Sequence, residues 1–227
     1  MHAIAIDGPA GAGKSYLAKT LAARLSYIYV DTGALYRSIG LFVFRHGIAK
    51  SDRAGIVSCL PAISLSLSYR ADGQHVLMNG EDVSADIRLP EISMYASAVS
   101  AIPEVRAFLV ELQRDMARNH NVVMDGRDIG TVILPNADVK IFLSASDEVR
   151  AERRYRELCA KGVQTTKEEV LRDMLQRDNN DRTRTIAPAI PAEDAVLLDN
   201  SLLDEEQTVQ AALRIILEKT GERPAKT

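Results

Sequence analysis

The chain has 227 residues, of which 46% are hydrophobic, and its 28 Lys and Arg against 31 Asp and Glu give a net charge of -3. This length and composition can supply the core of one α/β domain with an inserted element. The slightly acidic balance excludes a general attraction to nucleic acid or to an anionic membrane, so any anion site must be local. No apolar run approaches the roughly 20 residues of a membrane span, and the first residues carry no basic n-region or cleavage site. We therefore expect a cytoplasmic protein without a membrane or nucleic-acid partner, acting as a monomer.

Cysteine and histidine give no sign of a redox or zinc site. Cys59 and Cys159 stand far apart, and the four histidines show no metal-ligand spacing. We expect reduced thiols that take no part in chemistry. The chain also has no internal repeat and no low-complexity tract, so its organisation must come from ordinary helices and strands.

The first motif follows the apolar run 3–6, which predicts a buried strand. The next eight residues fit the phosphate-loop pattern G-x-x-x-x-G-K-[S/T]. They are Gly8, Pro9, Ala10, Gly11, Ala12, Gly13, Lys14 and Ser15. Glycines without Cβ atoms let backbone N–H groups face phosphate oxygens, and the helix that follows adds its positive N-terminal end. The motif predicts binding of a nucleoside triphosphate, with Lys14 on the outer phosphates and the Ser15 hydroxyl on Mg²⁺.

The elements after the loop form one crossover unit. Leu17, Leu21 and Leu25 recur with helical spacing and predict a helix over 14–25. A second short strand over 27–30 ends at Asp31, and a right-handed crossover makes it parallel to the first strand. Asp31 is therefore expected at the edge of the sheet where ligands collect. A second helix follows from about residue 32 and ends near Gly47.

The pattern changes between about residues 61 and 90. Alternating apolar residues at 63–69, a turn at Asp72-Gly73, a run over 75–78 and a second turn at Asn79-Gly80 predict a small antiparallel meander. Such a piece does not fit within a parallel sheet, so it is interpreted as an insertion. Helices are predicted over 91–100 and 103–118.

The second half returns to the core. A strand over 121–125 ends in Asp125, and a hydrophobic strand that ends in Asp commonly completes a phosphate-loop site by holding Mg²⁺ partly through water. Further strands are predicted at 139–143 and 195–198. Helices are predicted from Ser146 to Gly162, from Thr166 onwards, and over about 204–218.

Arginines gather on the two helices before the last strand and on their exit. They are Arg150, Arg153, Arg154, Arg156, Arg172, Arg177, Arg182 and Arg184. Acidic residues four positions earlier can pair with some of them, which is typical of a solvated face. Arg150 and Arg154, however, are like charges at i, i+4, and a bound triphosphate would offset them. We expect at least two of these arginines to face phosphate, on a helical pair with the anatomy of a closing lid.

The longer motifs resemble the bacterial cytidylate kinases, the CMP/dCMP kinases of the P-loop nucleoside monophosphate kinase superfamily. The resemblance covers nearly the whole chain. It is carried by residues 5–15, by D-T-G-A-L-Y-R at 31–37, by D-G-R-D-I-G-T at 125–131, and by 177–178 with 181–184. Tyr16, Asn180 and Thr183 depart from the usual family residues.

The resemblance implies a role for each matching residue. It implies that Arg37, Arg127 and Arg184 hold the CMP phosphate, that Ser97, Arg106 and Asp128 read the cytosine edge, and that Arg177 and Asp181 contact the sugar. Asp31 and Tyr36 join the substrate-binding set. Lys14, Arg127, Arg154 and Arg184 form the catalytic set, and Ser15 with Asp125 forms the metal set.

The fold implied is α/β: a P-loop three-layer αβα with a five-stranded parallel core sheet. The core covers about 1–60, 91–150 and 185–227, the small antiparallel β insertion of the monophosphate-binding region about 61–90, and the helical lid about 151–184. The reaction implied is transfer of the γ-phosphoryl group of ATP to CMP or dCMP.

Two other functions compete with this interpretation. A kinase for shikimate, gluconate or dephospho-coenzyme A would share the phosphate loop but would not need the cytosine readers Asp128 and Arg106. A nucleotide-dependent switch would bind ATP or GTP without transfer, but the chain lacks the guanine motif N-K-x-D. Fold-level analogy cannot separate these functions, so the decision depends on the site.

Overall fold

The computed structural model describes residues 1–70 and 73–221, and the chain divides into two compact units. The first unit consists of Met1–Tyr29 with Asn119–Thr227, and the second unit of Val30–Arg118. Each unit has its own cluster of buried hydrophobic side chains. Among the described residues, no helix is both long and apolar enough to cross a membrane.

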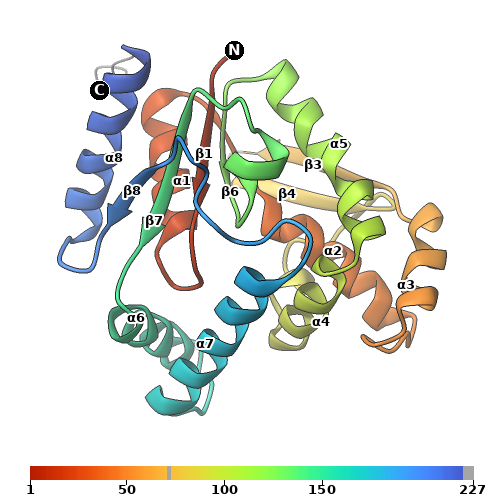
Figure 1. Ribbon diagram of the computed structural model, residues 1–227. Helices are drawn as coiled ribbons and strands as arrows, with labels where there is room; N and C mark the ends of the chain where they lie inside the picture. Colours follow the sequence, from red (N-terminus) through yellow and green to blue (C-terminus); the bar gives the residue numbers. More distant parts are fainter. Residues whose placement is uncertain (71–72, 222–227) are drawn as a thin grey trace. The chain divides into compact units, whose positions relative to one another are not determined.

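A five-stranded sheet with the order β2-β6-β1-β7-β8 is the main element of the first unit (Figure 1). Its strands are β1 (Ala3–Asp7), β2 (Ile28–Asp31), which runs into the second unit, β6 (Val122–Asp125), β7 (Val139–Ser144) and β8 (Val196–Asp199). β1 pairs in parallel with both β6 and β7, and β7 in parallel with β8. β1 therefore lies inside the sheet, which is why its residues from Ile4 onwards are buried and apolar up to Asp7.

Helices α1 (Lys14–Leu25) and α8 (Glu205–Thr220) pack against each other and against this sheet. Leu17 and Leu21 of α1 meet Val209 and Ile216 of α8 in the buried cluster. The unit also contains the single-turn π-helix η3 (Ile129–Ile133) and the paired helices α6 (Asp147–Ala160) and α7 (Lys167–Thr183). The predicted Ser146 cap and the Thr166 capping box are both present.

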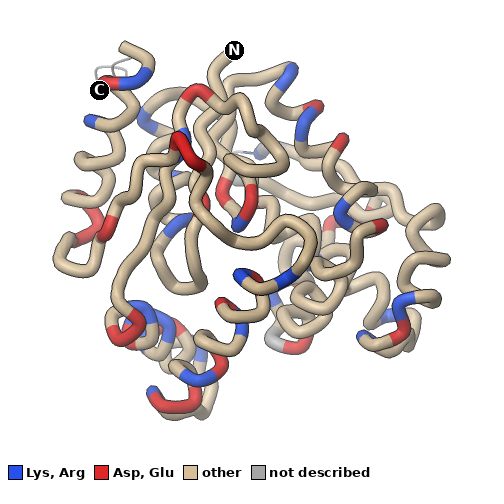
Figure 2. The backbone as a smooth tube through the Cα atoms, viewed as in Figure 1, with Lys and Arg blue, Asp and Glu red and all other residues tan. Residues whose placement is uncertain are grey.

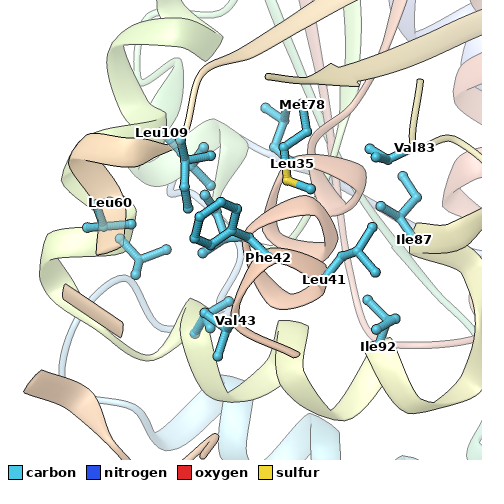
Figure 3. Packing of buried hydrophobic residues seen from close by; sticks show 14 of the residues in the cluster. Leu35, Leu41, Phe42, Val43, Leu60, Met78, Val83, Ile87, Ile92 and Leu109 are labelled. Carbon is cyan, nitrogen blue, oxygen red and sulfur yellow. The ribbon is translucent and has the colours of Figure 1, made fainter. Parts of the chain in front are cut away.

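The second unit is built around helix α2 (Thr32–Arg45). Helix α4 (Pro90–Ser100) packs closely on it at Gly40, where an added Cβ atom would lie 2.9 Å from the backbone nitrogen of Ala96. The other elements are α3 (Arg53–Cys59), η1 (Leu60–Ala62), η2 (Asp86–Arg88) and α5 (Pro103–Asn119). Figure 3 shows how Leu35, Phe42 and their labelled neighbours fill the space between these elements.

The predicted meander is a three-stranded antiparallel sheet, β3-β4-β5. Its strands are β3 (Leu65–Arg70), β4 (Gly73–Met78) and β5 (Glu81–Asp82). Leu65 and Leu67 of β3 pack against the same buried cluster as α2, which explains the alternation at 63–69, and Val76 and Met78 of β4 are buried in that cluster. The turn predicted at Asp72-Gly73 includes residues 71–72, which lie outside the described residues.

The parallel sheet with its helices, together with the separate antiparallel sheet, confirms the predicted fold class. The helical elements that were not predicted are α3, the 3-10 turns η1 and η2, and the π-helix η3. β2 and β8 each begin one residue later than predicted. The division into core, insertion and lid stays a prediction.

Candidate active site

The phosphate loop connects β1 to α1 and contains three glycines with positive φ angles. At Gly8, with φ of 145°, a Cβ atom would lie 2.0 Å from the carbonyl oxygen of Leu143, so only glycine fits beside β7. Gly13, with φ of 91°, is the N-cap of α1 and has no side chain to accept from the first turn. The N-terminal end of α1 is therefore left to attract an anion.

Lys14, the first residue of α1, is buried beside the phosphate loop, with 7% of its surface exposed. Its Nζ donates a hydrogen bond of 2.6 Å to the carbonyl oxygen of Pro9. Burial holds the pKa of Lys14 well below its usual range, and the positive charges of Arg127 and Arg177 lower it further, while Asp125 acts in the opposite direction. Cations that repel one another in a buried place are stabilised by an anion, so the potential at Lys14 favours phosphate binding.

Asp125, at the end of β6, carries a buried carboxylate that two hydroxyl groups hold in place. The Ser15 hydroxyl donates to its Oδ2 at 2.7 Å, and the Tyr29 hydroxyl donates to its Oδ1 at 2.9 Å. The hydroxyl of Ser15 and the carboxylate of Asp125 are hard oxygen donors of the kind that Mg²⁺ takes together with substrate phosphates and water. The residues present therefore fit the metal set predicted from the sequence.

Two arginines and two aspartates of the first unit form a connected ion-pair network. Arg127 Nε donates to Asp181 Oδ2 at 3.0 Å. Arg184 lies 3.4 Å from Asp128 and 3.8 Å from Asp181, and its Nε donates to the carbonyl oxygen of Ala187 at 2.6 Å. These residues come from two segments of the sequence, 127–128 and 181–184, and the structure brings them together with little exposure: Arg184 is 11% and Asp128 6% exposed at the side chain. Guanidinium groups in such a network can bind phosphate oxygens.

Arg150 of α6 holds the phosphate loop to both α6 and α7. One guanidinium nitrogen donates to the carbonyl oxygen of Ala10 at 2.7 Å and to Asp178 of α7. The backbone N–H of Ala10 donates to the other oxygen of Asp178 at 2.9 Å. The ion pair between Arg150 of α6 and Asp178 of α7 thus binds both the backbone N–H and the backbone carbonyl group of Ala10. We call these three residues, Ala10, Arg150 and Asp178, the loop clamp.

The loop clamp corrects one step of the sequence argument. Arg150 was expected to need a bound triphosphate to offset its charge beside Arg154. In the structure Arg150 is 4% exposed at the side chain and pairs with Asp147 and Asp178, so acidic side chains of the protein offset it. The acidic partner on α7 is remote in sequence, which is why local spacing did not predict it.

The exposed faces of α6 and α7 alternate in charge, as Figure 2 shows along both helices. Arg156 pairs with Glu152 at 2.6 Å, which confirms the predicted i, i+4 pair. Arg154, predicted to be catalytic, has a side chain 42% exposed and donates to Glu157 at 2.7 Å. Arg177 lies on α7, and its positive charge acts on Lys14. Exposed pairs such as those of Arg154 and Arg156 contribute little to stability.

The remaining predicted residues belong to the second unit. Asp31 is the N-cap of α2, accepts the N–H of Ala34 at 3.0 Å and lies 3.5 Å from Arg88. Arg106 of α5 is buried, with its guanidinium carbon 5.5 Å from the ring centre of Tyr36 and a hydrogen bond of 3.2 Å to the carbonyl oxygen of Ser100. The structure thus brings Tyr36 and Arg106 together. Arg37 follows Tyr36 on α2, and Ser97 lies on α4.

The sequence argument missed four polar residues that contact the predicted site of the first unit. The Tyr29 hydroxyl donates to Asp125, and Asp178 accepts the backbone N–H of Ala10. Asn200 donates to the carbonyl oxygen of Ala12 at 3.1 Å. Asp7 accepts the backbone N–H groups of the two residues that follow Asp128. Asp7 and Asp178 could have been suspected from their positions inside the motifs 5–15 and 177–184. Tyr29 and Asn200 carry no such signal, because each acts through a contact distant in sequence.

Comparison with known proteins agrees with the resemblance. The family described as "Cytidylate kinase" matches residues 4–218. A protein named cytidylate kinase from Carboxydothermus hydrogenoformans is 49% identical over 213 residues, covering 94% of this chain and 96% of the relative. One of the same name from Caldanaerobacter subterraneus is 50% identical over 217 residues, covering 96% and 95%. A solved structure of an uncharacterized protein from Eubacterium ventriosum is similar in fold alone, with a TM-score of 0.53, 13% identity, and coverage of 96% and 98%.

Proposed function

Because the chain belongs to the cytidylate kinase family, it is a nucleoside monophosphate kinase, and we propose that it transfers the γ-phosphoryl group of ATP to CMP or dCMP. The products are ADP with CDP or dCDP. The observation that carries the proposal most directly is the buried Lys14, whose pKa is lowered by burial and by Arg127 and Arg177. Such a cluster of cations is suited to two polyanionic substrates.

ATP is proposed to bind at the phosphate loop, Gly8 to Ser15. The supporting features are the positive φ angles of the glycines, the free N-terminal end of α1 and the ammonium group of Lys14. Ser15 and Asp125 would hold Mg²⁺, in part through water. The metal ion would supply charge neutralisation on the phosphates.

The residues proposed to bind CMP are those that the resemblance implies. In the first unit these are Arg127, Asp128, Arg177, Asp181 and Arg184, and in the second Asp31, Tyr36, Arg37, Ser97 and Arg106. Cytosine offers an amino donor to a carboxylate such as Asp128 and ring acceptors to a guanidinium such as Arg106. Uracil carries an acceptor in place of the amino group, so these two side chains favour cytosine. The existing pairs of Arg184 with Asp128 and Asp181 must loosen as Arg184 turns to the CMP phosphate.

The reaction needs no general base, because the attacking oxygen of the CMP phosphate is already an anion. Catalysis then consists of aligning two mutually repelling anions and stabilising the charge of the transferred group. Lys14, Arg127, Arg154 and Arg184 are the side chains proposed for this. Arg154 is half exposed on α6, so it would have to leave Glu157 to reach the phosphates.

Helices α6 and α7 are proposed to act as a lid that excludes water, because a poorly closed site would hydrolyse ATP. Their short connection, with Gly162 at φ 75°, and the exposed ion pairs on their surfaces suit a moving element. The loop clamp would keep α6, at Arg150, and α7, at Asp178, attached to the phosphate loop during closure. We propose that the enzyme works as a monomer in the cytoplasm, and size-exclusion chromatography with light scattering tests the first point.

The test of the proposed function is a coupled assay of ADP release with MgATP and a panel of monophosphates. CMP and dCMP should accelerate ADP release far more than UMP or AMP. Equal rates with AMP would contradict the assignment of Asp128 and Arg106 as base readers. Acceleration by shikimate or gluconate, with none by CMP, would place the chain among other kinases of this fold.

A further inference from the structure

Asp7 is a buried carboxylate that the transfer scheme above does not use. It is the last residue of β1, directly before Gly8, and it is 5% exposed. Its Oδ1 accepts the backbone N–H of Ile129 and its Oδ2 accepts the backbone N–H of Gly130, each at 2.8 Å. A buried carboxylate is costly unless hydrogen bonds satisfy it, so these two bonds hold the strand and the distant segment together.

The segment that Asp7 binds begins immediately after Asp128. Ile129 and Gly130 are the first residues of the π-helix η3, and Asp128 is its N-cap, with φ of -145° and ψ of 29°. Two successive N–H groups at the start of a helical turn need acceptors, and Asp7 supplies both from a neighbouring strand. The fit is close: a Cβ atom on Gly130 would lie 3.4 Å from Asp7 Oδ2 and 3.1 Å from the Lys140 side chain. The backbone on the C-terminal side of Asp128 is thereby fixed.

We infer that Asp7 is a positioning residue for base recognition: its two hydrogen bonds fix the backbone after Asp128 and so set the direction of the Asp128 carboxylate toward cytosine. Asp7 itself touches no substrate in this scheme. The inference rests on the proposed function, in which Asp128 reads the base. It adds the residue directly before the phosphate loop to the determinants of monophosphate specificity.

The charges around Asp7 support this coupling. Burial raises the pKa of Asp7 from its ordinary 3.8 to about 6, and the negative charge of Asp128 acts in the same direction. The backbone N–H groups of Gly130 and Ile129 and the charge of Lys14 lower it. From β7, the Lys140 side chain passes Gly130 on its way to Asp194. Asp7 is therefore coupled more strongly to the segment that carries the proposed base reader than to Lys14.

The test compares Asp7→Asn with a matched control at a carboxylate that bonds to the other end of β1. The amide keeps the size of the side chain but offers one acceptor in place of two, so one N–H group of the segment faces an NH₂ group. We expect the KM for CMP to rise about tenfold, as for one lost hydrogen bond to a charged group, and the preference for CMP over UMP to fall by a similar factor. The KM for ATP should change less than about twofold, since the bonds lost lead to Asp128 and not to the loop. Asp138→Asn removes a carboxylate that accepts the Ala3 N–H at 2.8 Å at the other end of β1, and it should change neither KM.

Amide hydrogen exchange of Ile129 and Gly130 in the substrate-free protein is the second readout. Exchange should accelerate in Asp7→Asn and not in Asp138→Asn. If Asp7→Asn does not fold, Gly130→Ala takes its place, because its Cβ atom would press on the Lys140 side chain at 3.1 Å and touch Asp7 Oδ2 at 3.4 Å, beside the same two hydrogen bonds. This variant should raise the KM for CMP alone. An unchanged KM for CMP, an equal rise in both KM values, or unchanged exchange would each overturn the inference. Failure of the unaltered chain to phosphorylate CMP would instead refute the proposed function, and the exchange measurement would still decide whether Asp7 fixes the segment.

Discussion

Several ionisable side chains of the first unit are less than a tenth exposed and are held by specific partners. Lys14 bonds to Pro9, Asp125 to two hydroxyl groups, and Arg150 to two carboxylates. Charged groups are seldom buried without such partners. Removing one partner leaves the other unsatisfied, so single substitutions here should have large effects.

Lys14→Ala removes the ammonium group that the phosphates are proposed to bind. We expect kcat/KM for CMP phosphorylation to fall by about a hundredfold or more, the size of effect seen when a preorganised donor to a transferring group is lost. Steady-state assays of ADP release measure this. Lys219→Ala, at an exposed position near the end of α8, is the control and should leave the rate unchanged. Retained turnover in Lys14→Ala would contradict the role of the loop.

Asp7 should make stability depend on pH in an unusual direction for a carboxylate. Its pKa is raised to about 6, above the 3.8 of the unfolded chain, so between these values the folded protein binds one proton more. The free energy of unfolding should therefore fall by about 3 kcal/mol in all as the pH rises from below 3.8 to well above 6, with about 2 kcal/mol of this fall between pH 4 and pH 6.

Urea denaturation of the unaltered chain and of Asp7→Asn across pH 4 to 7 measures this contribution as a difference. Other carboxyls act in the opposite sense: Arg24 and Gln210 lower the pKa of Glu206 to about 2, for example. These contributions are common to both proteins and cancel in the difference. A difference that does not vary between about pH 4 and 6 would mean that Asp7 keeps its ordinary pKa.

At the scale of elements, the loop clamp makes the phosphate loop part of the packing of α6 and α7. Gly11 also lies against these helices, because a Cβ atom there would be 3.1 Å from the carbonyl oxygen of Arg150 and 3.3 Å from the sulfur of Met174. A movement of the proposed lid would therefore act directly on the proposed ATP site. A change in one helix reaches the loop through two hydrogen bonds to a single residue, Ala10.

Arg150→Met tests how much the loop clamp contributes. It leaves Asp178 and the carbonyl oxygen of Ala10 without their buried partner, and we expect the free energy of unfolding to fall by about 3 kcal/mol. Arg156→Met on the same helix is the matched control, because Arg156 is 77% exposed at the side chain and its pair with Glu152 should contribute less than about 0.5 kcal/mol. Both values come from urea denaturation. Equal losses in the two variants would show that the clamp does not stabilise the fold.

The elements predicted from the sequence were those with strong local patterns. The leucines at 17, 21 and 25, the caps at Ser146 and Thr166, and the alternation before Tyr69 each depend on neighbours along the chain. Helix α3 was missed because only Ile56 of its seven residues is buried, which leaves little periodicity to detect. The π-helix η3 depends on Asp7, 122 residues away, and no local rule indicates it.

At the scale of the whole molecule, the order of the strands and the charge pairs of the site were beyond prediction from local patterns. β1 lies between β6 and β7, which follow it by more than a hundred residues. Separations of 28, 54 and 56 residues likewise explain why the partners Asp178 of Arg150, Asp181 of Arg127 and Asp128 of Arg184 were not foreseen. The motifs nevertheless predicted the family and the fold class. The reaction requires a particular backbone shape and particular charges at these positions, and both depend on residues that are close together in the sequence.

The central claim is that one chain binds ATP and CMP together for direct transfer between them. A bisubstrate compound, with adenosine and cytidine joined through a polyphosphate, tests this most directly by inhibition kinetics. The account predicts that the compound competes with both ATP and CMP and binds more tightly than either, because it bridges both subsites. Competition with only one of the two substrates would contradict the claim.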